Sequence, residues 1–544
     1  MASSVEIASG PVAGISGRDR SIAVYRGIPY AAPPVGELRW RPPEPPARWR
    51  EVLGAGAFGP MCPQSPHDAA KAGIDLPMSE DCLYVNVWAP ANAVRTGPLP
   101  VLVWVYGGGF RAGTGAHPRY DGEGLARHGL VVVTFNYRLG AFGFLATPEL
   151  SAESVHGASG NYGLLDGIAL LRWVQANIAA FGGDPGRVTL AGQSAGAGTV
   201  NLLAMSPLAR GLFHRAVAQS HVRHSRDPEL RYLATSYREL ADAERAGDRY
   251  AREHGARSLA ELRSLPWQKL VDGRPAFDTE VDTRSTAKPP LFRPVVDGWV
   301  LPAGYEETYA KGRQNTVDYL AGNNLDESGA VPESTFADHR AGGSAVPGPG
   351  APPVHVTLDS FVAAARRKFG AMAEEFLRLY PAGSDDEAAR ASNAAVRDNS
   401  RISTYLWGTQ WTEHAGRPVH TYFWTHPSPA QGQNPPRASH SSEIEFVFDN
   451  LDPAAAPWTD KDHEIAATVS AYWANFAATG DPNGPGLPHW PAYTADSPSV
   501  MEIGGAFGPI PLADPARFDF WKRFFRAQHR MVSPLCADRL SKMT

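Results

Sequence analysis

Two nearly continuous apolar runs place the strongest constraint on how this chain can fold. Val101–Tyr106 and Leu130–Phe135 have the length of strands, and the second contains three consecutive valines. Runs without polar alternation are typical of strands buried on both faces, as in a parallel sheet covered by helices. Between the second run and a later strand-like segment, Arg187–Ala191, lies Leu164–Phe181, whose apolar residues follow a helical stripe. This order predicts an α/β fold with a mostly parallel central sheet and helices on both faces.

Helical segments interrupt this order further along the chain. Residues 221–290 are rich in Arg and Glu with helical spacing, and residues 330–415 contain a second helical stretch, Ser360–Tyr380. A strand-like run, Val419–Trp424, then returns to the earlier pattern. We therefore expect one α/β unit over residues 1–544, with two large helical insertions that shape a pocket.

Composition excludes several classes of partner. The 51 basic and 56 acidic residues give a net charge of −5, so no surface for nucleic acid is indicated. No apolar run reaches the roughly 18 residues of a membrane span. The first ten residues, MASSVEIASG, lack the basic and apolar parts of a secretory signal. We expect a monomer with no nucleic-acid or membrane partner, cytoplasmic as written, or secreted if a signal has been removed.

The segment Gly192-Gln193-Ser194-Ala195-Gly196 matches G-x-S-x-G, the motif of a nucleophile elbow. Chance matches are common in a long chain, so the context decides. A strand-like run comes directly before the motif and a helix-like run, Ala197–Met205, directly after it, as an elbow requires. The alternative is a plain β–α turn with a capping serine. The context favours Ser194 as a nucleophile.

A triple glycine, Gly107–Gly109, follows the first apolar run. Backbone N–H groups without side chains can stabilise the oxyanion of an acyl intermediate, together with the N–H of the residue after the nucleophile. The predicted donors are Gly108, Gly109 and Ala195; a flexible surface loop is the alternative. A G-x-G-x-x-G match at residues 54–59 lacks the strand and helix of a dinucleotide site, and no CxxC pair occurs. We expect neither a cofactor nor a metal.

These motifs belong to a longer series that resembles the type-B carboxylesterases, the cholinesterase-like branch of the α/β-hydrolases. The series covers nearly the whole chain and is most similar to the bacterial p-nitrobenzyl-esterase and fumonisin-esterase types. Its further members are YRGIPYA at 25–31, SEDCLY at 79–84, FNYR at 135–138, GNYGL at 160–164 and FGGDP at 181–185. The resemblance implies an α/β-hydrolase fold. It also implies a serine carboxylesterase that cleaves small-molecule esters through an acyl-enzyme.

The resemblance also assigns the other two members of a catalytic triad. The pattern G-x-N-x-D-E ends on Glu327, which implies the acid, and the pattern H-x-x-E begins on His440, which implies the general base. Asp326 is the alternative to Glu327 as the acid. His420 and His426 are the alternatives to His440 as the base. Serine stands where the family usually has glycine at two positions, Ser328 and Ser441.

The family pattern further implies a disulfide between Cys62 and Cys82 and leaves Cys536 unpaired. Without a signal peptide, reduced thiols are the alternative state. An amidase or carbamate hydrolase would use the same triad. A non-catalytic adhesion protein of this family usually lacks the nucleophile, which this chain keeps.

Substrate preference is left open between two interpretations. Phe110 follows the triple glycine and is either a pocket wall or core. The basic residues of segment 221–226, including Arg223 and Arg226, either face the pocket mouth and favour substrates with carboxylates, or form a solvated face.

Overall fold

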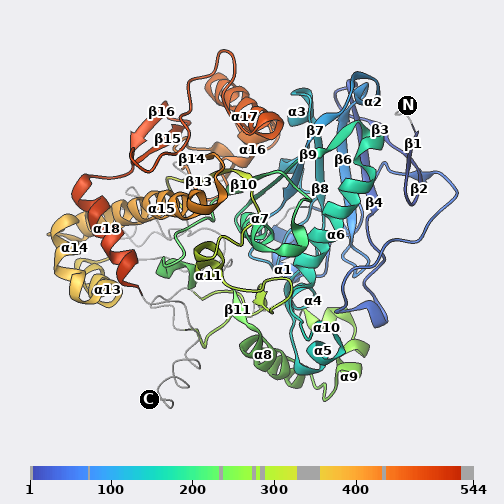
Figure 1. Cartoon of the computed structure of the whole chain (residues 1–544), viewed down its shortest axis with the longest axis horizontal. Coiled ribbons are helices and arrows are strands. Elements are labelled where there is room, and N and C mark those ends of the chain that lie inside the picture. The colour runs from blue at the N-terminus through green and yellow to red at the C-terminus, as the bar shows by residue number, and fades with distance from the viewer. Residues whose placement is uncertain are drawn as a thin grey trace.

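The computed structural model describes residues 4–71, 74–231, 237–271, 277–281, 288–327, 356–431 and 436–528. An eleven-stranded sheet runs through it in the order β16-β15-β14-β13-β10-β9-β7-β8-β6-β4-β3 (Figure 1). These strands are β3 (Ile15–Ser16), β4 (Ile22–Pro29), β6 (Tyr84–Pro90), β7 (Leu99–Val105), β8 (Val131–Phe135), β9 (Gly183–Gln193), β10 (Arg215–Gln219), β13 (Asp318–Asn324), β14 (Val419–Trp424), β15 (Ser499–Ile503) and β16 (Phe507–Pro511).

The centre of the sheet is parallel and its edges are antiparallel. Every neighbouring pair from β15 to β8 is parallel, whereas β16, β6, β4 and β3 pair antiparallel. All five residues of β8 are buried, and so is β7 after its first residue, because helices cover both faces. The prediction of a mostly parallel sheet from these apolar runs is confirmed.

Two groups of helices cover the central strands. Helices α6 (Tyr162–Asn177) and α7 (Ala195–Met205) contact each other and β9, while α3 (Glu123–Arg127) and α17 (Asp460–Thr479) contact each other and strands of the same region. The predicted helix 164–181 ends as α6 at Asn177 and continues as a 3₁₀ turn, Ile178–Phe181. The left-handed glycine that follows, Gly182 (φ 82°), closes this turn.

Among the described residues, Tyr162–Phe181 is the one helical segment long and apolar enough to cross a membrane by composition. In this fold most of α6 is buried against the protein. It carries Asp166, which forms an ion pair of 2.6 Å with Arg138 in the interior. Burial against the sheet therefore accounts for the apolar character of this helix.

The described parts of both expected insertions are mainly helical. The first contains α8 (Leu240–Glu253), α9 (Leu259–Ser264) and α10 (Trp267–Leu270), and a short strand, β11 (Arg238–Glu239), which pairs with β12 (Val295–Val296). The second contains α13 (Leu358–Phe369), α14 (Ala373–Leu379) and the long α15 (Asp385–Ala415); its residues 330–355 lie outside the described residues. Figure 1 shows α13, α14 and α15 gathered with α18 (Pro515–Ala527), and aromatic side chains such as Phe369 and Trp521 pack between them.

The remaining elements are short. A separate three-stranded sheet at the N-terminal end contains β1 (Ser4–Ile7), β2 (Gly10–Ala13) and β5 (Leu53–Gly54). The other helices are α1 (Pro66–Lys71), α2 (Ala93–Thr96), α4 (Gly140–Phe144), α5 (Pro148–Glu153), α11 (Tyr305–Ala310) and α16 (Ile444–Val447).

Candidate active site

Ser194 lies at the turn between β9 and α7, near the centre of the sheet. Its φ of 58° and ψ of −125° fall in a region that residues with a side chain rarely adopt. The flanking glycines make the turn possible. A Cβ on Gly196 would lie 2.0 Å from the carbonyl oxygen of Val105, and one on Gly192 would lie 2.6 Å from the carbonyl carbon of Gly196. The strand, sharp turn and helix therefore present Ser194 as a nucleophile elbow does.

The triple glycine forms a loop directly after β7, beside this turn. A Cβ on Gly107 would lie 2.9 Å from the Ser194 Cβ, so only glycine lets the loop approach so closely. Gly108 and Gly109 have φ values of 117° and 65°. Within the described residues, no group accepts a hydrogen bond from the N–H of Gly108, Gly109 or Ala195. Backbone donors of this kind, in a loop that approaches the Ser194 turn, are what a developing oxyanion requires.

His440 and Glu327 meet although 113 positions separate them in the chain. The distance from His440 Nδ1 to Glu327 Oε2 is 2.5 Å. The other carboxylate oxygen of Glu327 accepts a hydrogen bond of 2.9 Å from the backbone N–H of Asn324, at the end of β13. The Nε2 of His440 faces the Nε2 of Gln193 at 3.2 Å. A Ser194–His440 hydrogen bond is not formed among the described residues.

The electrostatics of the pair favour an ionised carboxylate. Burial alone would raise the pKa of Glu327, but the facing His440 and several hydrogen bonds hold this pKa below its ordinary value. Burial likewise would lower the pKa of His440, yet Glu327, with Glu443 behind it, raises this pKa above its ordinary value against the opposing charge of Arg119. The surrounding charges therefore favour the protonated form of the imidazole.

The rival residues are engaged elsewhere. Asp326 forms ion pairs with Arg397 (3.0 Å) and Arg437 (3.4 Å). His426 contacts Asp462 at 2.6 Å. His420 is buried in β14, where burial lowers its pKa to about 4. None of the three faces Ser194 through any contact in the described residues.

A buried network behind His440 was not foreseen from the sequence. Glu443 accepts hydrogen bonds from Gln219 Nε2 (2.8 Å) and Asn324 Nδ2 (2.6 Å), and Trp473 Nε1 donates to Gln219 Oε1 (3.0 Å). Burial raises the pKa of Glu443. The sequence signal was the glutamate of the H-x-x-E pattern, but its partners come from three other elements.

Arg119 forms hydrogen bonds with the segment that carries His440. Its guanidinium donates to the carbonyl oxygen of Ser441 (3.2 Å) and to Glu445 Oε1 (2.5 Å). Ser441 has a φ of 71°, a conformation that favours glycine, which is the residue that the family resemblance implies at this position. The strained loop is therefore held from outside by a side chain of another segment. The second departure from the family pattern, Ser328, lies outside the described residues.

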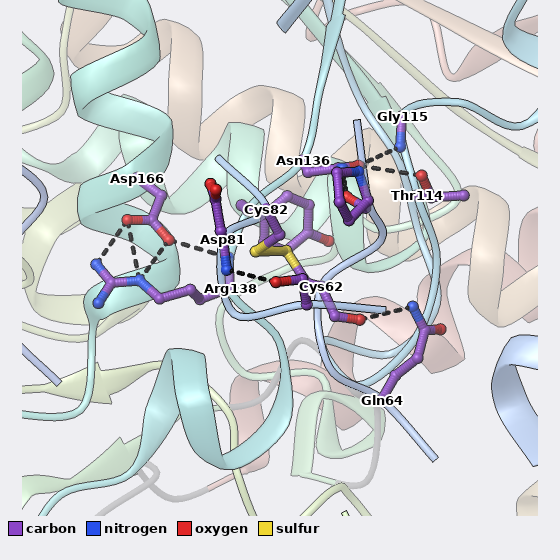
Figure 2. The surroundings of a disulfide bond; sticks show 12 residues. Cys62, Gln64, Asp81, Cys82, Thr114, Gly115, Asn136, Arg138 and Asp166 are labelled. Atoms are coloured by element: carbon purple, nitrogen blue, oxygen red, sulfur yellow. Dashed lines mark hydrogen bonds and ion pairs between the residues drawn. A yellow bond between two sulfur atoms is a disulfide. The ribbon is translucent and has the colours of Figure 1, made fainter. Parts of the chain in front are cut away.

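The segment after Cys62 supports the triple-glycine loop. Cys62 and Cys82 form a disulfide with a Cα–Cα distance of 5.1 Å (Figure 2). Gln64 Nε2 donates to the carbonyl oxygen of Gly113 (3.0 Å), and the N–H of Gly113 donates back to Gln64 Oε1 (2.9 Å). The cross-link therefore anchors a segment that binds the triple-glycine loop. Cys536 lies outside the described residues.

The structure does not support a positive field from segment 221–226. Arg223 is buried and pairs with Asp227 (3.2 Å) and Glu229 (3.1 Å), and Arg226 pairs with Glu306 (2.7 Å). A carboxylate therefore pairs with each cation, as the buried charge of Arg223 requires. Phe110 is fully buried and packs edge-on against Phe144, with ring centroids 5.1 Å apart, which favours its interpretation as core.

A cavity of about 990 Å³ adjoins Arg119 and Glu445, with Arg26, Phe58 and Trp458 also in its wall. None of Ser194, Glu327 and His440 lines it, so this cavity is separate from the proposed chemistry. Across the described part of the chain, no group of three His, Cys, Asp or Glu side chains is arranged to hold a metal ion.

Comparisons with known proteins agree on one family. The profile of the carboxylesterase family matches residues 1–512. The fumonisin B1 esterase of Sphingopyxis macrogoltabida is 38% identical over 515 residues, which cover 92% of this chain and 86% of that protein. The liver carboxylesterase of Sus scrofa is 34% identical over 539 residues, covering 92% and 89%. Among solved structures, a thermophilic PNB esterase has a TM-score of 0.76 at 29% identity, covering 96% of this chain and all of that one.

Proposed function

The chain belongs to the carboxylesterase family and is a carboxylic ester hydrolase, and on that premise we propose that it acts as a serine esterase through Ser194, His440 and Glu327. The observation that carries the proposal is the 2.5 Å contact between His440 Nδ1 and Glu327 Oε2. This contact leaves Nε2 as the nitrogen that takes a proton, which is the arrangement of a general base.

In the proposed reaction the Ser194 hydroxyl attacks the ester carbonyl and its proton passes to His440 Nε2. Glu327 keeps the imidazole in the required tautomer and stabilises the imidazolium. The N–H groups of Gly108, Gly109 and Ala195 donate to the oxyanion. His440 then returns the proton to the leaving alcohol, and the acyl group stays on Ser194.

The second half of the reaction uses the same groups. His440 takes a proton from water, the hydroxide attacks the acyl-enzyme, and Ser194 leaves with the proton held by the imidazolium. The products are an alcohol and a carboxylic acid. Every step moves a proton or an acyl group, so this chain's own residues complete the cycle.

The test compares wild type, Ser194→Ala and Ser497→Ala with p-nitrophenyl esters of increasing acyl length. Ser497 is exposed and remote in sequence, so its variant is the matched control. We expect the Ser194→Ala variant to lose its activity and its labelling by an alkyl phosphonate, while the control keeps both. Hydrolysis that survived Ser194→Ala would refute the proposal. Matched p-nitroanilides test the amidase alternative, and we expect the esters to react faster.

A further inference from the structure

Gln193, the residue before the proposed nucleophile, has its own contact with the proposed base. It is the last residue of β9 and only 3% exposed. Its Nε2 lies 3.2 Å from Nε2 of His440. Among the described residues, no other hydrogen bond reaches that nitrogen. The side chain therefore occupies the position at which the base receives a proton.

The two hydrogen bonds of His440 determine which ring nitrogen carries the proton of the neutral imidazole. Glu327 Oε2 on Nδ1 accepts only, when the carboxylate is ionised, so the proton of the neutral ring lies on Nδ1. Nε2 then has a lone pair, and the amide N–H of Gln193 donates to it. This is the tautomer that a general base needs. A ring with the proton on Nε2 would face the amide N–H donor to donor, which is repulsive.

The neighbouring glutamine shows by contrast what is special about Gln193. Gln219 is its register partner on β10, and both ends of its amide are held: Nε2 donates to Glu443 and Oε1 accepts from Trp473. The Oε1 of Gln193 receives no hydrogen bond from any described residue. Turning its amide by 180° therefore breaks one hydrogen bond, whereas turning that of Gln219 breaks two.

Resting on the proposed function, we propose that Gln193 is a positioning residue whose amide exchanges ends during catalysis. In the free enzyme its N–H holds the neutral imidazole in the base tautomer. When substrate binds, this hydrogen bond breaks and leaves the single lone pair of Nε2 to the Ser194 hydroxyl. Once the proton is on Nε2, the amide turns and Oε1 accepts from the new N–H until the proton passes to the leaving alcohol. The same side chain thus serves both protonation states of His440 without adding a charge.

The charges already around the ring explain why a neutral side chain suits this position. The titratable groups that face His440 are Glu327 from the segment after β13, Glu443 from the start of α16, and Arg119 from the loop before α3. The two carboxylates outnumber the guanidinium. A third carboxylate at position 193 would favour the imidazolium and leave less of the free base at neutral pH.

The test measures kcat/KM against pH for wild type, Gln193→Glu, Gln193→Met, His440→Ala and Gln528→Glu. We expect Gln193→Glu to move the acid limb upward by about one pH unit or more, as an opposite charge in contact does. Gln193→Met, which is similar in size but has no amide, lowers the plateau and moves the limb less. Gln528 follows α18, which packs against α13, α14 and α15, so its variant adds the same charge away from His440 and leaves the limb in place.

Each result has one interpretation. An acid limb of Gln193→Glu that coincides with that of Gln528→Glu overturns the inference, because a carboxylate facing Nε2 has to stabilise the imidazolium. Activity that persists in His440→Ala refutes the proposed function instead. If His440→Ala is inactive and the acid limb of the pH profile does not move in Gln193→Glu, only the role of Gln193 is refuted.

Discussion

The disulfide between Cys62 and Cys82 allows a prediction about stability whose magnitude follows from the length of the loop that it closes. It closes a loop of 20 residues. Cross-linking a loop of that length removes about 11 cal/mol/K of entropy from the unfolded chain, which corresponds to about 3 kcal/mol at 25 °C. With an unfolding entropy of about 2.1 cal/mol/K per residue over 544 residues, the double variant Cys62→Ser, Cys82→Ser is expected to melt about 3 °C lower.

The assay follows thermal unfolding by the fluorescence of the 14 tryptophans, alongside esterase activity. We expect a reductant to lower the midpoint of wild type to that of the double variant and to leave the double variant unchanged. Cys536→Ser, which keeps the cross-link, serves as the control. Because Gln64 ties this segment to Gly113, thermal inactivation should follow the same order. Equal midpoints for wild type with and without reductant would show that the cross-link does not stabilise the fold.

Three further predictions concern the site. Glu327→Gln should lower kcat by a factor on the order of 10⁴ and move the acid limb to lower pH, because the charge that raises the pKa of His440 is lost; Asp326→Asn, measured in parallel, should stay near wild type. Arg119→Ala leaves a buried carboxylate without its cation and should cost about 3–5 kcal/mol of stability by denaturant titration. Gly196→Ala places a Cβ 2.0 Å from a carbonyl oxygen, so we expect little folded protein by circular dichroism; a stable, active variant would contradict the close approach.

Local signals were sufficient for the centre of the sheet. The runs at 101–106 and 130–135 correspond to β7 and β8, and the predicted helix after Ser194 is α7. Each of these elements is buried on all sides, so its apolar residues are continuous and its type can be recognised without its neighbours. The glycines of the elbow are equally local, because the backbone of one turn requires them.

The edges of the sheet and the long helix of the second insertion were harder to recognise. β16 contains two prolines and a glycine, residues that are rare in strands except at an edge. α15 has buried residues along its whole length and on several sides, so no single apolar stripe marks it as a continuous helix of 31 residues. Tertiary packing decided both elements.

By itself, the sequence determined the fold class, the turn that presents Ser194 and, through motifs shared with a family, the candidates Glu327 and His440. Only the tertiary structure decided which side chains touch. It paired His440 with Glu327 across 113 positions, placed Gln193 on the opposite ring nitrogen, and matched Arg223 and Arg226 with carboxylates. The physical reason is that hydrogen bonds and ion pairs act over a few ångströms in space, and distances along the chain do not specify them.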